Sequence, residues 1–198
     1  MARAGGVARS HLAPSLPAAI RDDGSSFQAV RFADDGSVLE RGTVNGLAPG
    51  STWARGQAWT ILGLVNAYRA TGAPEILAAA ERTARFFCDR LPPELIPPWD
   101  LDAASGEPAD SSAAAIVASA LLDLGGEWRE RALELLGALV TSCLNRGDSD
   151  GLLLHGCYRY TMGAGIDCAT AWGDFFLLDA LVHAVEPESR LDPLADGG

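Results

Sequence analysis

The residues best suited to chemistry lie in one short run, Trp53-Ala-Arg-Gly-Gln-Ala-Trp59. If this run is helical, Arg55 and Trp59 are four residues apart and share a face. A planar guanidinium can bind a carboxylate through two N–H groups, and an indole offers a flat wall for a sugar ring. Gln57 adds an amide to the same run. The pattern predicts a binding site for a ligand that carries a carboxylate; the alternative is that both tryptophans belong to the core and Arg55 pairs with a buried acid.

Weaker candidates come from three other places in the chain. Trp99 and Asp100 follow two prolines in a predicted loop that could reach the same site. Asp110 stands where a helix should begin, and an aspartate in that position is usually a helix cap. Asp174 could face a ligand or could be a charge in the first turn of a helix. The three histidines are scattered and are expected to be structural, and no Ser/His/Asp constellation is present.

Charge excludes several kinds of function. The chain has 198 residues, with 15 basic and 26 acidic side chains and a net charge of −11. All the basic residues are arginines, so a phosphate-binding loop with its lysine, a Schiff base and a lysine general base are excluded. An acidic chain without a basic stripe is a poor ligand for nucleic acid or an anionic membrane, and we expect neither as a partner.

The four cysteines form no Cys-x-x-Cys pair, and with the histidines they form no zinc pattern. We therefore expect free thiols and neither a metal nor a cofactor. The first twenty residues are broken by charges and prolines, and no run of apolar residues is long enough to span a membrane. These features predict a cytoplasmic protein.

Apolar spacing and capping residues predict five helices, over residues 52–71, 74–90, 110–124, 127–145 and 169–185, with room for a sixth short one before Pro14. Residues 27–39 are typical of a small β-hairpin, and residues 152–158 of a short strand or an extended loop. We expect one domain over residues 1–186 and a polar, frayed tail over residues 187–198.

The helices alternate in character, which indicates the architecture. The first, third and fifth begin with polar or aromatic residues and continue with small or apolar ones, as inner helices would. The second and fourth carry arginine and glutamate at exposed spacing, as outer helices would. Alternating inner and outer helices predict an all-α fold of the α/α-toroid type in which the inner helices begin at one common mouth.

Chain length allows only about half of such a ring, because twelve helices with their loops need far more than 198 residues. The inner helices carry an apolar layer made of Ile61, Leu64, Ile116, Leu121, Phe175 and Leu178. Its open edges could lead to self-association.

The motifs together resemble a known family. They are Ile20-Arg-Asp-Asp-Gly-Ser25, Ser51-Thr-Trp-Ala-Arg-Gly-Gln-Ala-Trp59, Pro98-Trp-Asp100, Asp110-Ser-Ser-Ala-Ala-Ala115, Gly151-Leu-Leu-Leu-His-Gly156 and Trp172-Gly-Asp-Phe-Phe176. In this order they resemble the unsaturated glucuronyl hydrolases, glycoside hydrolase family 88. The resemblance implies an (α/α)6 barrel that removes a 4,5-unsaturated uronic acid from oligosaccharides made by polysaccharide lyases.

The resemblance also implies roles for residues. Trp53, Arg55 and Trp59 match substrate-binding positions, and Asn45 stands where the family has a substrate-contacting glutamine. The spacing at Gln57 distinguishes the chain from the related unsaturated rhamnogalacturonyl hydrolases.

In this family an aspartate protonates C4 of the double bond and activates water to attack C5, and the resulting hemiketal opens to release the sugar. The two active-site aspartates lie in the N-terminal half of the family, so this chain resembles the C-terminal half without them. We expect an enzyme, either such a hydrolase or the half of one that supplies the substrate site. The alternative is a non-catalytic carbohydrate-binding or scaffold remnant of the fold.

Overall fold

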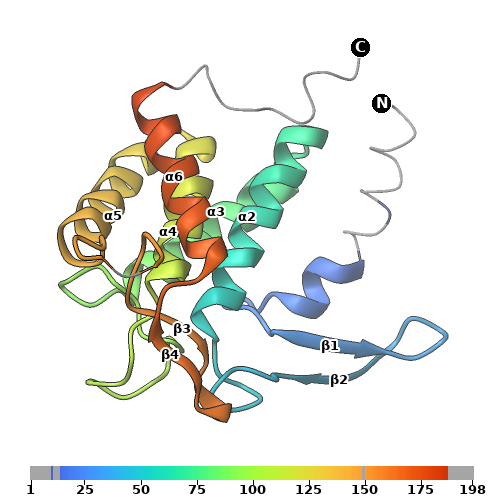
Figure 1. Cartoon of the computed structure of the whole chain (residues 1–198). Coiled ribbons are helices and arrows are strands. Elements are labelled where there is room, and N and C mark those ends of the chain that lie inside the picture. The colour runs from blue at the N-terminus through green and yellow to red at the C-terminus, as the bar shows by residue number, and fades with distance from the viewer. Residues whose placement is uncertain (1–9, 11–13, 149, 187–198) are drawn as a thin grey trace.

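The computed structural model describes residues 10, 14–148 and 150–186. The expected tail over residues 187–198 lies outside this range, as does nearly all of the short helix expected before Pro14; residues 14–19 are helical. Five longer helices and two small β-hairpins follow (Figure 1). The elements in chain order are β1 (Ala29–Phe32), β2 (Val38–Gly42), α2 (Ala54–Thr71), α3 (Pro74–Asp89), α4 (Ser111–Leu124), α5 (Trp128–Ser142), β3 (Gly156–Arg159), a 3-10 turn η1 (Tyr160–Met162), β4 (Ala164–Cys168) and α6 (Ala171–Val185).

Helix α4 is the centre of the molecule. Twelve of its fourteen residues are buried, because α2 packs on one side of it, α6 on the other, and α5 behind it. Its Ala-rich sequence allows these close approaches. Helix α3 packs against α2 in the same way as α5 packs against α4. The structure therefore has an inner layer of α2, α4 and α6 and an outer layer of α3 and α5, as the alternation in the sequence predicts.

All three inner helices begin at the same end of the molecule, where β3 and β4 lie (Figure 1). We call this end the mouth. Helix α6 begins after Thr170, whose Oγ1 accepts a hydrogen bond from the Gly173 N–H at 3.2 Å. Gly173 also lets α6 approach α4, since a Cβ there would lie 3.2 Å from Cβ of Ser112. Helix α2 ends at Gly72 in a left-handed conformation, which glycine adopts without strain.

Four of the five helices begin one or two residues later than predicted, and α3 begins at the predicted residue. Trp53 directly precedes α2, and no side chain caps this helix. The nearby Ser51 hydroxyl donates to the Asp100 carboxylate at 2.7 Å. Asp110 precedes α4 but does not cap it, because its carboxylate binds other groups.

The β-structure is more extensive than an all-α fold with one hairpin. Strands β1 and β2 pair antiparallel and overlap the predicted hairpin region 27–39, with β2 ending three residues beyond it. A second hairpin, β3–β4, pairs Gly156 with Cys168 and Arg159 with Ala164. The sequence predicted a short strand or an extended loop over residues 152–158 but no second strand, because β4 (Ala-Gly-Ile-Asp-Cys) has no clear alternation.

Helix α6 of the inner layer has an exposed apolar side. Of the six residues predicted to form the inner apolar layer, Ile61, Leu64, Ile116 and Leu121 are buried, while Phe175 and Leu178 are 61% and 51% exposed. Val182 and Val185 continue the exposed stripe along α6 at helical spacing. None of the described helices combines the length and the apolar character needed to cross a membrane.

Candidate binding site

Arg55 lies at the centre of the mouth and is almost completely buried, with 3% of its surface exposed. Its Nη1 donates to Asp110 Oδ2 at 2.6 Å and to the Cys157 carbonyl at 2.8 Å, and its Nη2 donates to the Tyr158 carbonyl at 2.6 Å. The guanidinium therefore joins the first turn of α2 to the start of α4 and to strand β3. This is the ion pair with a buried acid that the sequence left open as an alternative.

Asp110 is completely buried and serves this ion pair. Burial raises the pKa of its carboxyl above the ordinary value, and the positive charge of Arg55 acts in the opposite direction. Its Oδ1 also accepts hydrogen bonds from the Ser112 hydroxyl at 2.6 Å and from the Cys157 N–H at 3.3 Å. These contacts hold Asp110 in place and leave it no access to solvent.

Two indoles enclose the Arg55 guanidinium. Its carbon lies 4.8 Å from the ring centre of Trp53 and 5.1 Å from that of Trp172, distances typical of cation–π contacts. Trp172 Nε1 donates to the Ser112 hydroxyl at 3.1 Å. Gly56 leaves room for Trp53, since a Cβ at that position would lie 2.8 Å from the indole Cε3. Sequence reasoning did not place Trp172 among the binding residues, although it begins the fifth predicted helix.

The outer part of the mouth is an exposed aromatic wall. Trp59 on α2 is 38% exposed and contacts Phe176 of α6 edge to face, with ring centres 5.4 Å apart. Tyr158 of β3 is 49% exposed and packs on Trp172 at 5.7 Å. Aromatic faces of this kind can stack on the apolar side of a sugar ring while the surrounding polar groups bind its hydroxyls.

Asn45 is joined to Arg159 of β3, a residue that the sequence did not single out. Its Oδ1 accepts a hydrogen bond from Arg159 Nε at 3.1 Å, while its own N–H donates to Gln28 Oε1. Arg159 is only partly buried, and its two terminal nitrogens make no hydrogen bond to any residue that the structure describes. Arg159 was missed because its place depends on the β3–β4 hairpin.

The structure places Gln57 away from the mouth. It is fully buried, and it lies two residues from Trp59, which places it on the opposite face of α2. Its amide accepts from the Ser26 hydroxyl and donates to the carbonyls of Gly24 and Thr83. Gln57 therefore anchors the N-terminal loop and α3 to α2, and has no group left for a ligand.

Asp100 and Asp174 likewise hold the protein backbone. Asp100 is fully buried and accepts from the Leu47 N–H at 2.8 Å as well as from Ser51. Asp174 Oδ1 accepts from two successive backbone N–H groups, those of Leu152 and Leu153. The side chain of Trp99 is 1% exposed and lies under Tyr160, with ring centres 4.5 Å apart. Asp100 and Trp99 are thus buried inside the protein, and the half-buried Asp174 holds the backbone that precedes β3.

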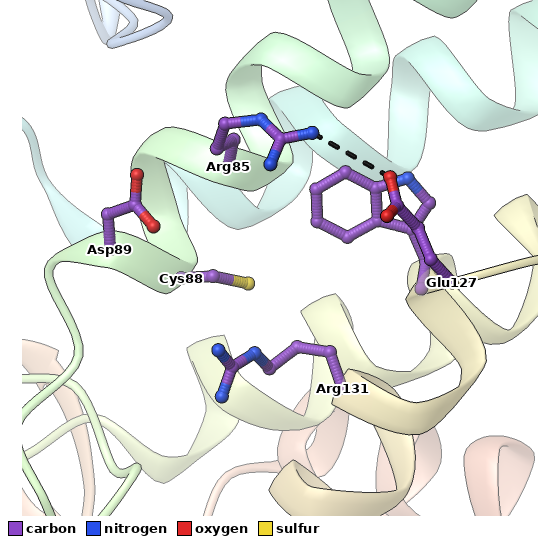
Figure 2. A pocket seen from close by; sticks show the side chains of 6 residues that line it. Arg85, Cys88, Asp89, Glu127 and Arg131 are labelled. Atoms are coloured by element: carbon purple, nitrogen blue, oxygen red, sulfur yellow. Dashed lines mark ion pairs between the residues drawn. The ribbon is translucent and has the colours of Figure 1, made fainter.

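A separate cavity of about 170 Å³ lies on the outer side of the molecule, between α3 and α5. In Figure 2 the Cys88 thiol points between Arg85 and Arg131. Arg85 pairs with Glu127 at 3.7 Å and Arg131 with Glu134 at 2.7 Å, so both positive charges are balanced. Burial raises the pKa of Cys88 to about 11, which keeps this thiol protonated and unreactive at neutral pH. No group of three or more His, Cys, Asp or Glu side chains in the described residues could hold a metal ion.

The inner and outer helices are consistent with part of an α/α toroid. No protein-family model matches the chain. It is 33% identical over 193 residues to an unsaturated glucuronyl hydrolase of Bacillus sp. (strain GL1), which covers 89% of this chain and 51% of that protein. It is 32% identical over 192 residues to an unsaturated chondroitin disaccharide hydrolase of Streptococcus pyogenes serotype M1, covering 89% of this chain and 48% of that one.

A solved structure agrees with these sequence matches. The structure of UGL with dGlcA-Glc-Rha-Glc superposes with a TM-score of 0.88 at 31% identity, over 92% of this chain and 52% of that one. The chain is thus related to the unsaturated glucuronyl hydrolases, which confirms the resemblance found in its motifs. It spans about half the length of the curated relatives that it matches.

Proposed function

We propose that this chain supplies the substrate-binding part of a glycoside hydrolase of the unsaturated glucuronyl hydrolase kind. The ligand is an oligosaccharide that ends in a 4,5-unsaturated uronic acid. The mouth, where α2, α4 and α6 begin, receives this sugar. The observation that carries the proposal is the exposed aromatic wall of Trp59, Phe176 and Tyr158 around a fixed guanidinium, in a chain related to hydrolases of such sugars.

The contacts at the mouth suggest a division of roles. Trp59 and the outer face of Trp53 stack on the sugar, and Asn45 binds one of its hydroxyls. Arg55 already donates from both terminal nitrogens to protein groups, so it shapes the mouth and adds positive potential. Arg159 has terminal nitrogens free among the described residues and binds the carboxylate of the ligand.

The carboxylates near the mouth favour binding over catalysis for this chain. Asp100 and Asp110 are fully buried and are bound to backbone N–H groups or to Arg55, so neither is placed to transfer a proton to a ligand. This supports the view that the proton donor of the family is neither Asp100 nor Asp110. It also supports the second candidate function, a carbohydrate-binding protein that does not hydrolyse its ligand.

Titration calorimetry tests the proposal. The chain should bind an unsaturated uronic acid disaccharide. It should bind the same disaccharide at least about tenfold more weakly when the carboxylate is reduced to an alcohol, which is the loss expected for a charge-assisted hydrogen bond. Arg159→Ala should remove this preference, and Arg85→Ala, at the outer cavity, should not change it. Equal binding of both disaccharides, or no binding at all, would contradict the proposal.

Absorbance of the unsaturated disaccharide separates the two candidate functions. The chain alone is expected to bind the disaccharide without consuming its enol ether, so the absorbance should stay constant. A decrease that is abolished by Asp100→Asn or Asp110→Asn would show that one of these buried carboxylates is the proton donor and that the chain is itself an enzyme.

A further inference from the structure

Two residues of the β3–β4 hairpin have left-handed backbones, and their side chains meet. His155 has φ +64° and Asp167 has φ +56°; among the other described non-glycine residues only Leu95 has a positive φ. Such conformations are costly for residues with a Cβ and persist where surrounding contacts impose them. His155 Nδ1 and Asp167 Oδ1 are 2.6 Å apart. An ionised carboxylate only accepts hydrogen bonds, so Nδ1 is the donor.

The pair closes the base of the hairpin. His155 directly precedes β3, and Asp167 lies in β4 beside Cys168, which pairs with Gly156. The same base is fixed to α4, because the Ser111 N–H donates to the His155 carbonyl at 3.0 Å and the Ser111 hydroxyl to the Leu154 carbonyl at 2.6 Å. The two strained residues therefore lie where the hairpin leaves the helical body.

The hairpin carries groups that form the mouth. The carbonyls of Cys157 and Tyr158 accept the hydrogen bonds of Arg55, the Tyr158 ring packs on Trp172, and Arg159 donates to Asn45. Two short strands are only marginally stable by themselves, so contacts at the base have a large effect on where the tip lies. A change in the hairpin angle would move the Tyr158 ring and the Arg159 guanidinium together.

We propose that His155 and Asp167 are positioning residues of the mouth. Their hydrogen bond holds two strained backbones in the conformation that keeps the hairpin on Arg55 and directs Tyr158 and Arg159 toward the ligand. Neither side chain touches the ligand. The effect on ligand affinity rests on the proposed function, whereas the effect on the hairpin does not.

Glycine and asparagine variants separate the hydrogen bond from the backbone strain. Asp167→Gly and His155→Gly remove the bond but accept a positive φ without strain, so the fold should be retained. Asp167→Asn keeps an acceptor oxygen and tolerates the left-handed conformation.

Hydrogen exchange of the β3 amides should become about tenfold faster in both glycine variants. Affinity for the unsaturated disaccharide should fall about fivefold, which is the size of one hydrogen bond. Asp167→Asn should stay within about twofold of the original chain in both measurements, and the double glycine variant should be no worse than either single one.

The matched control is Glu40→Gln, which removes an exposed ion pair with Arg31 from the β1–β2 hairpin at 2.9 Å. It should change neither β3 exchange nor affinity. Unchanged or slower β3 exchange in Asp167→Gly, or an Asp167→Asn variant as impaired as Asp167→Gly, would overturn the proposal. If the original chain binds no disaccharide while the exchange results are as expected, the proposed function fails and the role of the pair in holding the hairpin stands.

Discussion

At the scale of single residues, the sequence suggested that the Arg55 guanidinium binds the ligand, whereas the structure shows that it holds parts of the protein together. Arg55 joins α2 to α4 and to β3 through Asp110 and two backbone carbonyls. Its burial between Trp53 and Trp172 excludes water, so each of these hydrogen bonds is stronger than it would be at the surface. The mouth is therefore built around a charge that the protein itself neutralises.

Arg55→Ala should lower the free energy of unfolding by about 3–5 kcal/mol, because it leaves Asp110 buried without its counter-charge. The loss should depend on pH. Burial raises the pKa of Asp110 in the folded protein, and without Arg55 this pKa rises further. The variant therefore loses stability as the pH increases from 3.8, the ordinary pKa of the unfolded chain, through the raised pKa of the folded variant. Denaturant unfolding of both proteins across this range measures the effect.

The control for this variant is Arg31→Ala, which breaks the exposed ion pair with Glu40 and should cost less than about 1 kcal/mol at every pH. A loss in Arg55→Ala that stays constant from acid to neutral pH would show that removing Arg55 does not raise the pKa of Asp110, and would contradict the proposed role of the buried ion pair.

At the scale of elements, helix α2 offers a direct comparison between two of its glycines. A Cβ at Gly56 would lie 2.8 Å from the Trp53 ring, whereas a Cβ at Gly63 would meet nothing within 4 Å. Gly63→Ala should stabilise the protein by about 0.5–1 kcal/mol, the ordinary gain of replacing glycine in a helix.

Gly56→Ala should gain less stability than Gly63→Ala and should weaken binding of the unsaturated disaccharide several-fold, because the new methyl group displaces Trp53 from Arg55. Thermal unfolding and titration calorimetry of the two variants give both numbers. Identical behaviour of the two variants would mean that the position of Trp53 does not matter for the mouth.

The elements also show what the sequence could and could not predict. Helix spacing and the residues that follow each helix predicted α2 to α6 to within a few residues, because the helical period and the glycine stops are local signals. The inner and outer layers followed from the same signals. The β3–β4 hairpin could not be predicted, since its pairing depends on contacts with Arg55 and α4 that are distant in sequence.

The candidate site, like the fold, was predicted only in part from the sequence. The sequence found the run from Trp53 to Trp59, in which two tryptophans flank an arginine and a glutamine. Helical spacing alone places Gln57 on the face opposite Trp59. The sequence did not show that Asp100 and Asp174 bind backbone N–H groups, because these contacts join residues more than twenty positions apart. Arg159 became visible only when the hairpin placed it beside Asn45.

At the scale of the whole molecule, the apolar stripe on α6 should make the chain self-associate. Phe175, Leu178, Val182 and Val185 are each about half or more exposed and lie on one side of the helix. Sedimentation over a range of concentrations should show dimers or larger species. Leu178→Glu should shift the chain toward the monomer, since a charge in an apolar interface is costly.

Leu133→Glu, which changes a 44% exposed leucine on the outer helix α5, is the control and should leave the association unchanged. A monomer at all concentrations that also binds no hydrophobic dye would contradict the view that the α6 stripe is an open apolar edge.

The five tryptophans of the chain report directly on where the ligand binds. Trp53, Trp59 and Trp172 lie at the mouth, while Trp128 lies at the outer cavity between α3 and α5. The measurement is fluorine NMR of the chain labelled with 5-fluorotryptophan, titrated with an unsaturated uronic acid disaccharide and assigned by Trp→Phe variants. The signals of the three mouth tryptophans should shift together with one dissociation constant, and that of Trp128 should remain in place. A shift of Trp128 alone, or no shift of any signal at saturating disaccharide, would contradict the account.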